Sequence, residues 1–125
     1  MRADPRAARI IVVDDNKDTA DLMAWWLRTG GFIVETAADG AAALALMDTF
    51  KAHCVLLDVL MPRLDGLELA RQLRARHERV VLIAMSGLGA DDSRVADTSD
   101  LVDHYFEKPV DLDALAKVLE PWPAE

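Results

Sequence analysis

Short apolar runs alternate with segments of helical periodicity along this chain, and this alternation limits the folds that it can adopt. The apolar runs cover residues 10–13, 32–34, 54–57, 80–83 and 105–106. The first, third and fourth are continuously apolar, which is typical of strands buried on both faces of a parallel sheet. The second alternates with polar residues and suits an edge position.

Segments with apolar residues at helical spacing follow each of these runs. They cover residues 17–29, 41–50, 66–76, 90–98 and 111–119. Gly30 and Gly31 end the first segment, and Asp111 caps the last. In the fourth segment only Val95 and Ala96 can pack against a core, so we expect a shortened or irregular helix there.

The alternation predicts an α/β fold, a (βα)5 three-layer sandwich with helices on both faces of a parallel five-stranded sheet. Its crossovers should be right-handed. The 125 residues contain no linker, repeat or low-complexity tract. We therefore expect one domain over residues 1–125, with a core at 9–119 and loose ends at the termini.

Composition argues against several classes of protein. No apolar run approaches the roughly 18 residues that a membrane helix needs, and no apolar segment follows the first residues as in a secretory signal. The net charge of −8 repels nucleic-acid backbones, so direct binding of nucleic acid is not expected. The single cysteine, Cys54, cannot form an internal disulfide. It fits a reducing compartment, so we expect a cytoplasmic protein.

Four of the five apolar runs end in residues that can take part in chemistry. Asp14 and Asp15 follow the first run, and Asp58 ends the third. Ser86 comes after the fourth run and Lys108 after the fifth. In an open parallel sheet, functional groups lie outside the carboxyl ends of the strands. The pattern therefore predicts that three carboxylates, a hydroxyl and an ammonium group meet in one crevice.

Three carboxylates in one site repel one another, and a hard divalent cation would remove this conflict. A cluster of aspartates suits Mg²⁺, which keeps several waters and accepts phosphate oxygens. With the charge of Lys108 and the hydroxyl of Ser86, the set has the groups needed to stabilise a phosphoryl group in transfer. Asp58, at the end of the middle strand, is best placed to attack phosphorus as a nucleophile.

The blocks IIVVDDN, VLLDVLMPRLDG, VLIAMSG and YFEKPVD follow one another along the chain. In their residues, order and spacing they resemble the receiver domain of bacterial two-component response regulators, over about residues 9–119. The resemblance implies a flavodoxin-like fold with strand order 2-1-3-4-5. It also implies a magnesium-dependent signalling switch that phosphorylates and dephosphorylates itself, rather than a turnover enzyme.

By this resemblance, Asp58 is the phosphoacceptor of a phosphorelay. Its phosphoryl group would come from a phosphohistidine of a sensor histidine kinase or of a phosphotransfer domain. The Mg²⁺ ligands would be Asp15, Asp58 and the backbone carbonyl of Leu60, with Asp14 acting through a water molecule.

The resemblance also implies a switch. Ser86 would bind a phosphoryl oxygen, Lys108 would pair with the phosphate, and Tyr105 would swing inward as Ser86 moves. The surface made by the fourth helix, fifth strand and fifth helix would then change its packing, and it is also a possible homodimer interface. A cis peptide bond would join Lys108 to Pro109.

Other interpretations of these residues stay open. The chain could be an inactive pseudo-receiver that acts as a protein-interaction module. A phosphatase that forms an aspartyl-phosphate would need a second aspartate two residues after its nucleophile, where Leu60 stands. A flavin-binding module would need a Ser/Thr/Gly-rich phosphate loop after the first strand, where Asp14 and Asp15 would repel that phosphate.

The remaining reactive or bulky residues favour structural roles. His53, His77 and His104 lie in different segments and lack metal-ligand spacing, so we expect them at the surface or its boundary. Trp25 and Trp26 are adjacent and cannot both face one core. We expect one to be buried and the other partly exposed, where a partner contact is the minority interpretation.

Overall fold

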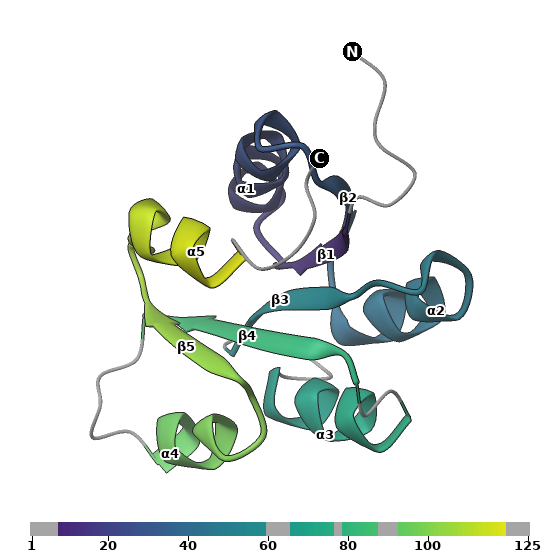
Figure 1. Cartoon of the computed structure of the whole chain (residues 1–125). Helices are drawn as coiled ribbons and strands as arrows, with labels where there is room; N and C mark the ends of the chain where they lie inside the picture. The colour runs from purple at the N-terminus through teal and green to yellow at the C-terminus, as the bar shows by residue number, and fades with distance from the viewer. Residues whose placement is uncertain (1–7, 60–65, 77–78, 88–92, 120–125) are drawn as a thin grey trace.

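The structure is a computed structural model of the whole chain, and it describes residues 8–59, 66–76, 79–87 and 93–119. Within these ranges strands and helices alternate strictly (Figure 1). In chain order they are β1 (Arg9–Val13), α1 (Lys17–Thr29), β2 (Ile33–Ala37), α2 (Gly40–Phe50), β3 (Cys54–Asp58), α3 (Gly66–Arg76), β4 (Val81–Ser86), α4 (Ser93–Ser99), β5 (His104–Glu107) and α5 (Leu112–Leu119).

The strands form one parallel sheet in the order β2-β1-β3-β4-β5, which confirms both the predicted fold class and the strand order implied by the resemblance. In Figure 1, α1 and α5 lie on one face of the sheet, and α2, α3 and α4 lie on the other. Every residue of the central strand β3 is buried. The edge strand β2 exposes Glu35 and Thr36 at its middle, as its mixed sequence predicts.

Alternate residues of each strand point to opposite faces of the sheet and so enter two separate cores. Ile11 and Val13 of β1 pack into the cluster under α2 and α3. Ile10 and Val12 pack into the cluster under α1 and α5. Because both faces are covered, the inner strands need the continuous apolar sequences from which they were predicted.

The structure shows where the cysteine lies and confirms the prediction for the two tryptophans. The Cys54 side chain is fully buried, and burial raises the pKa of its thiol far above the ordinary value, so the thiol stays protonated. Trp26 packs against the core under α1 and α5, whereas Trp25 is 62% exposed. His53 and His104 are both exposed, and His77 lies outside the described residues.

The fourth helix is short, as expected. It runs from Ser93 to Ser99, and the start of the range predicted for it, residues 90–92, lies outside the described residues. Among the described residues, no helix has the length and the apolar character that crossing a membrane requires.

Gly66 begins α3 in close contact with the end of β3. A Cβ atom added at this position would lie 2.5 Å from the carbonyl oxygen of Asp58 and 2.6 Å from the Cα atom of Val59. Both neighbours are backbone atoms, which cannot move aside as the tip of a side chain can. The missing side chain therefore lets α3 start directly against the strand end that carries Asp58.

We expect Gly66→Ala to lower the free energy of unfolding by about 1–3 kcal/mol, because the added methyl group overpacks the junction of β3 and α3. Urea denaturation followed by circular dichroism measures this change. Gly87→Ala is the matched control, since a Cβ atom there would meet nothing within 4 Å. Equal stability of the two variants would show that the close approach at Gly66 does not constrain the fold.

Candidate functional site

The turn after β1 fixes two aspartates at the carboxyl edge of the sheet. The backbone N–H of Asp14 donates to the carbonyl of Ala37 at 3.1 Å, which holds the turn beside the end of β2. One carboxylate oxygen of Asp14 accepts from the backbone N–H of Asn16 at 2.9 Å. The side chain of Asn16 in turn accepts from the N–H of Thr19 and caps α1. The helix therefore starts directly after Asp14 and Asp15.

Three carboxylates meet at this edge. Asp14, Asp15 and Asp58 each place one oxygen within 4.8 Å of the other two. Asp14 and Asp58 are 2% and 6% exposed, whereas Asp15 is open to solvent. Two of these hard oxygen donors are buried and the third faces solvent. Such a set fits Mg²⁺, which prefers carboxylates together with retained waters. Leu60, whose carbonyl the resemblance adds as a ligand, lies outside the described residues.

Lys108 joins this cluster from the far end of the chain. Its Nζ atom donates to Asp58 at 2.9 Å and to Asp14 at 3.2 Å. Burial by itself would lower the pKa of Lys108, but the hydrogen bond and charge of Asp58 and the charge of Asp14 outweigh it, so the pKa is raised. The ammonium group therefore stays charged and offsets part of the carboxylate repulsion.

Two further predicted residues lie on β4 and β5. Ser86 ends β4 and is fully buried, and its carbonyl accepts from the backbone N–H of Lys108 at 2.8 Å. Tyr105 lies on β5 in register with Ala84 and packs against the core under α2 and α3. The peptide bond between Lys108 and Pro109 is cis, as the resemblance implies.

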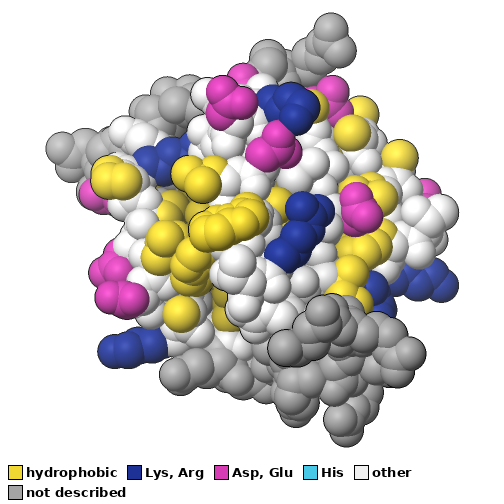
Figure 2. Space-filling view, turned by 90° about the horizontal axis from the view of Figure 1, so that it is seen from above, with side chains coloured by type: hydrophobic (Ala, Val, Ile, Leu, Met, Phe, Trp, Pro, Cys, Tyr) yellow, Lys and Arg dark blue, Asp and Glu magenta, His cyan; other side chains and the backbone are white. Residues whose placement is uncertain are grey.

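An apolar groove opens beside the carboxylates, and the sequence interpretation did not foresee it as a unit. It has a volume of about 360 Å³, lies between α1 and the start of α5, and includes Asp14 and Lys108 in its lining. Leu22, Trp25 and Leu112 also line it and are 68%, 62% and 39% exposed. Figure 2 views the face that α1 and α5 cover, where hydrophobic side chains gather at the surface. The sequence did hold a signal for this groove, namely apolar residues at outward positions of the first helix. This signal was noted only for Trp25 and Trp26.

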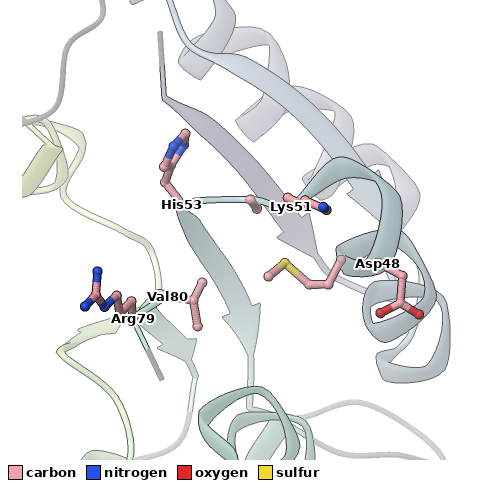
Figure 3. Close-up of a pocket in the computed structure, with 7 residues that line it drawn as sticks. Asp48, Lys51, His53, Arg79 and Val80 are labelled. Carbon is pink, nitrogen blue, oxygen red and sulfur yellow. The ribbon is translucent and has the colours of Figure 1, made fainter. Parts of the chain in front are cut away.

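A larger cavity of about 540 Å³ lies at the opposite edge, before the starts of β3 and β4. Asp48, Lys51, His53 and Arg79 contribute its polar groups, and Figure 3 shows the ends of Asp48, His53 and Arg79 pointing away from one another. The Nδ1 atom of His53 accepts from the backbone N–H of Arg9, and burial together with the charge of Arg9 lowers the pKa of His53. Since its polar groups do not converge, this cavity is not a candidate site.

Fold and site together define an α/β domain in which an acidic pocket, bonded to the ammonium group of Lys108, stands at the carboxyl edge of a five-stranded parallel sheet. The family model of the response regulator receiver domain matches residues 10–120, and the chain belongs to this family.

Individual relatives agree with this assignment. Response regulator MprA from Mycobacterium sp. (strain KMS) is 38% identical over 107 residues, which are 86% of this chain and 46% of MprA. The chain therefore spans about half the length of the curated relatives that it matches.

Solved structures are similar over nearly the whole chain. A response regulator receiver protein from Pseudomonas putida has a TM-score of 0.85 at 25% identity, covering 92% of this chain and 97% of that one. Response regulator TrrA from Thermotoga maritima, solved in complex with Mg²⁺ and BeF, has a TM-score of 0.81 at 28% identity. The match covers 91% of this chain and 97% of TrrA.

We expect Mg²⁺ to raise the thermal midpoint of unfolding, because a cation that binds the folded cluster and not the unfolded chain stabilises by about 2.7 kcal/mol at a hundredfold excess over Kd. Asp15→Asn should reduce the shift, because it removes the solvent-facing carboxylate of the cluster. Asp18→Asn is the matched control, an exposed aspartate of α1 outside the cluster. Differential scanning fluorimetry measures the shift, and an equal shift in both variants would contradict the assigned donor set.

Proposed function

We propose that this receiver domain is a phosphoacceptor of a two-component phosphorelay, in which Asp58 takes a phosphoryl group from a phosphohistidine of a sensor kinase or phosphotransfer domain. The observation that carries the proposal is the setting of Asp58. Its carboxylate is buried, bonded to Lys108 at 2.9 Å, and grouped with the carboxylates of Asp14 and Asp15. In this proposal residues 1–125 form a single receiver domain with a core at 9–119.

The reaction forms one bond and breaks one bond. A carboxylate oxygen of Asp58 attacks phosphorus, the oxygen–phosphorus bond forms, and the bond from phosphorus to the histidine nitrogen breaks. The leaving imidazole keeps the electron pair of that bond and takes up a proton from solvent. The neutral histidine of the donor protein is thereby regenerated, and Asp58 holds an acyl phosphate.

Charge is the main obstacle to this step, because a phosphoryl group carries negative charge into a cluster of carboxylates. Lys108 stays protonated beside Asp58 and can turn one of its hydrogen bonds to a phosphoryl oxygen. Mg²⁺, held by Asp14, Asp15 and Asp58 with the carbonyl of Leu60, would neutralise further oxygen charge. The hydroxyl of Ser86 would donate to another phosphoryl oxygen.

The same event would operate the switch. Ser86 would move toward the phosphoryl group, Tyr105 would occupy the inward position, and the surface of α4, β5 and α5 would change its packing. That surface is also the proposed homodimer interface. We place the domain in the cytoplasm and assign it no direct contact with nucleic acid, in keeping with its reduced cysteine and net charge of −8.

The competing functions fit the residues less well. An inactive pseudo-receiver would not need Asp14, Asp15, Asp58 and Lys108 gathered at one edge of the sheet. A phosphatase lacks the general acid that it requires, since Leu60 stands at that position.

Incubation with acetyl phosphate and Mg²⁺ should add the mass of one phosphoryl group to the wild-type protein and none to Asp58→Asn. Intact-protein mass spectrometry measures the adduct. Asp48→Asn is the control, because this exposed aspartate lies on α2, outside the cluster. An unmodified wild-type protein that binds Mg²⁺, or an adduct of equal yield on Asp58→Asn, would refute the proposal.

We also propose that the phosphodonor protein covers the groove beside the pocket. Leu22, Trp25 and Leu112 are exposed, and they line the same groove as Lys108 and Asp14. A histidine that reaches Asp58 must bring its surrounding surface close to this groove. Burial of exposed apolar side chains at the centre of such an interface contributes much of its affinity.

Trp25→Ala should slow phosphoryl transfer from a phosphorylated histidine kinase domain by about tenfold or more, as expected for an interface tryptophan. Transfer from acetyl phosphate should be unchanged, because a small donor needs no protein surface beyond the acidic pocket. Thr49→Ala, an exposed change on α2, should affect neither reaction. Loss of both reactions in Trp25→Ala would indicate damage to the fold, and loss of neither would exclude the groove from docking.

A further inference from the structure

One arginine ties three separate segments together at the amino edge of the sheet. Arg74 lies in the last turn of α3, and its Nη1 atom donates to the carbonyl of Val80 at 2.8 Å. Its Nε and Nη2 atoms donate to the carbonyl of Leu101 at 3.3 and 3.0 Å. Nη2 also contacts the carboxylate of Asp103 at 2.9 Å. The guanidinium group therefore links α3, the segment before β4 and the connection from α4 to β5.

Asp103 fastens the start of β5 to β4. Its carboxylate accepts from the backbone N–H of Leu82 at 2.9 Å, in addition to Arg74. Its own backbone N–H donates to the carbonyl of Leu82 at 2.8 Å. We call the side chains of Arg74 and Asp103 the clamp. Because the clamp acts on the residue just before His104, it fixes the point at which β5 begins.

The other end of β5 is fixed at the phosphoryl pocket. The backbone N–H of Lys108 donates to the carbonyl of Ser86 at 2.8 Å, and its side chain reaches Asp58. β5 itself has four residues, and Tyr105 lies between the two fixed ends. A shift of the strand at the clamp end would therefore move Tyr105 while Lys108 stays in place.

Among the described residues, no hydrogen bond of its own hydroxyl holds the ring of Tyr105 in its inward position. The hydroxyls of Thr98 and Tyr105 are buried, and within the part of the chain that the structure describes neither has a hydrogen-bond partner. A buried hydroxyl without a partner is unfavourable, and water would satisfy that of Tyr105 if the ring turned outward. The charge-assisted bonds of the clamp hold the backbone that leads into Tyr105.

We propose that Arg74 and Asp103 are positioning residues that hold Tyr105 against the core under α2 and α3, and so set the balance of the switch. This inference rests on the proposed function, because it assigns the clamp a role in the response to phosphoryl binding. Neither residue belongs to the acidic pocket. When the clamp is broken, the inward position of Tyr105 loses its support. Because that position is coupled to phosphoryl binding in the proposed switch, the pocket should then bind a phosphoryl group less tightly.

The chain offers a direct probe, because Tyr105 is its only tyrosine. Incorporation of 3-fluorotyrosine gives a ¹⁹F NMR signal from this ring alone, and broadening by a soluble gadolinium chelate reports how far the ring is exposed. Without any phosphoryl analogue, Arg74→Gln and Asp103→Asn should each raise the population of molecules with an exposed Tyr105 ring by on the order of tenfold. This is the usual effect of losing a hydrogen bond between charged groups.

Arg71→Gln is the matched control. Arg71 lies one turn earlier on the same helix, is 57% exposed, and pairs with Glu68 at 3.7 Å. Arg71→Gln removes the same charge without changing the connection to β5, so the Tyr105 ring should be as buried as in the wild-type protein. Arg74→Lys, which keeps the charge but cannot contact all three segments, should expose the ring to an intermediate degree.

A titration with beryllofluoride and Mg²⁺ completes the test. Both clamp variants should bind beryllofluoride more weakly than Arg71→Gln, and saturation should return the ring to its inward position. A ring as buried in the folded clamp variants as in Arg71→Gln would overturn the inference, and so would an exposed ring with unchanged beryllofluoride affinity. A wild-type protein that does not bind beryllofluoride would instead refute the proposed function, while the comparison without beryllofluoride still tests the clamp.

Discussion

The contact of the Lys108 ammonium group with two buried carboxylates is the interaction on which the carboxyl edge of the sheet depends. Asp14 and Asp58 are almost fully buried, and two such charges are tolerated only with a compensating charge nearby. Lys108 supplies this charge, although it lies 94 positions from Asp14 and 50 positions from Asp58 in the sequence. This reach requires β5 to lie beside β4 in the observed register, because Ser86 then holds the backbone of Lys108 at the pocket.

In the function proposed above, the same balance explains why a phosphoryl group would act as a signal at this edge. A carboxylate that becomes an acyl phosphate gains negative charge and oxygen acceptors, so Lys108 must share its hydrogen bonds among more partners. Its backbone is continuous with β5, and the strand carries Tyr105. Under the proposed function, a change in charge at Asp58 would therefore reach the surface around Tyr105 through one short strand.

Sequence alone predicted the elements and the chemical groups at the strand ends, because both depend on local patterns. Continuous apolar runs specify buried strands, and Asp14 or Asp58 directly after such a run must lie at the carboxyl edge. The strand order came from the resemblance. The clamp was out of reach, since Arg74 and Asp103 are 29 positions apart and each looks like an ordinary surface charge. The groove was missed because its rim joins Trp25 of α1 to Leu112 of α5, two residues that are far apart in the sequence.

The distribution of burial separates the part of the domain that reacts from the part that responds. Asp58 ends β3, whose every residue is buried between two strands and two layers of helices, so the reacting carboxylate is held where local opening costs most. Tyr105 lies on β5, an edge strand of four residues with exposed ends, beside a fourth helix of seven residues. There the clamp and the pairing with β4 hold the strand in place. In the proposed function, Asp58 must keep its place to accept a phosphoryl group and Tyr105 must move to report it. The sheet would meet both needs because the two residues lie on strands of unequal burial.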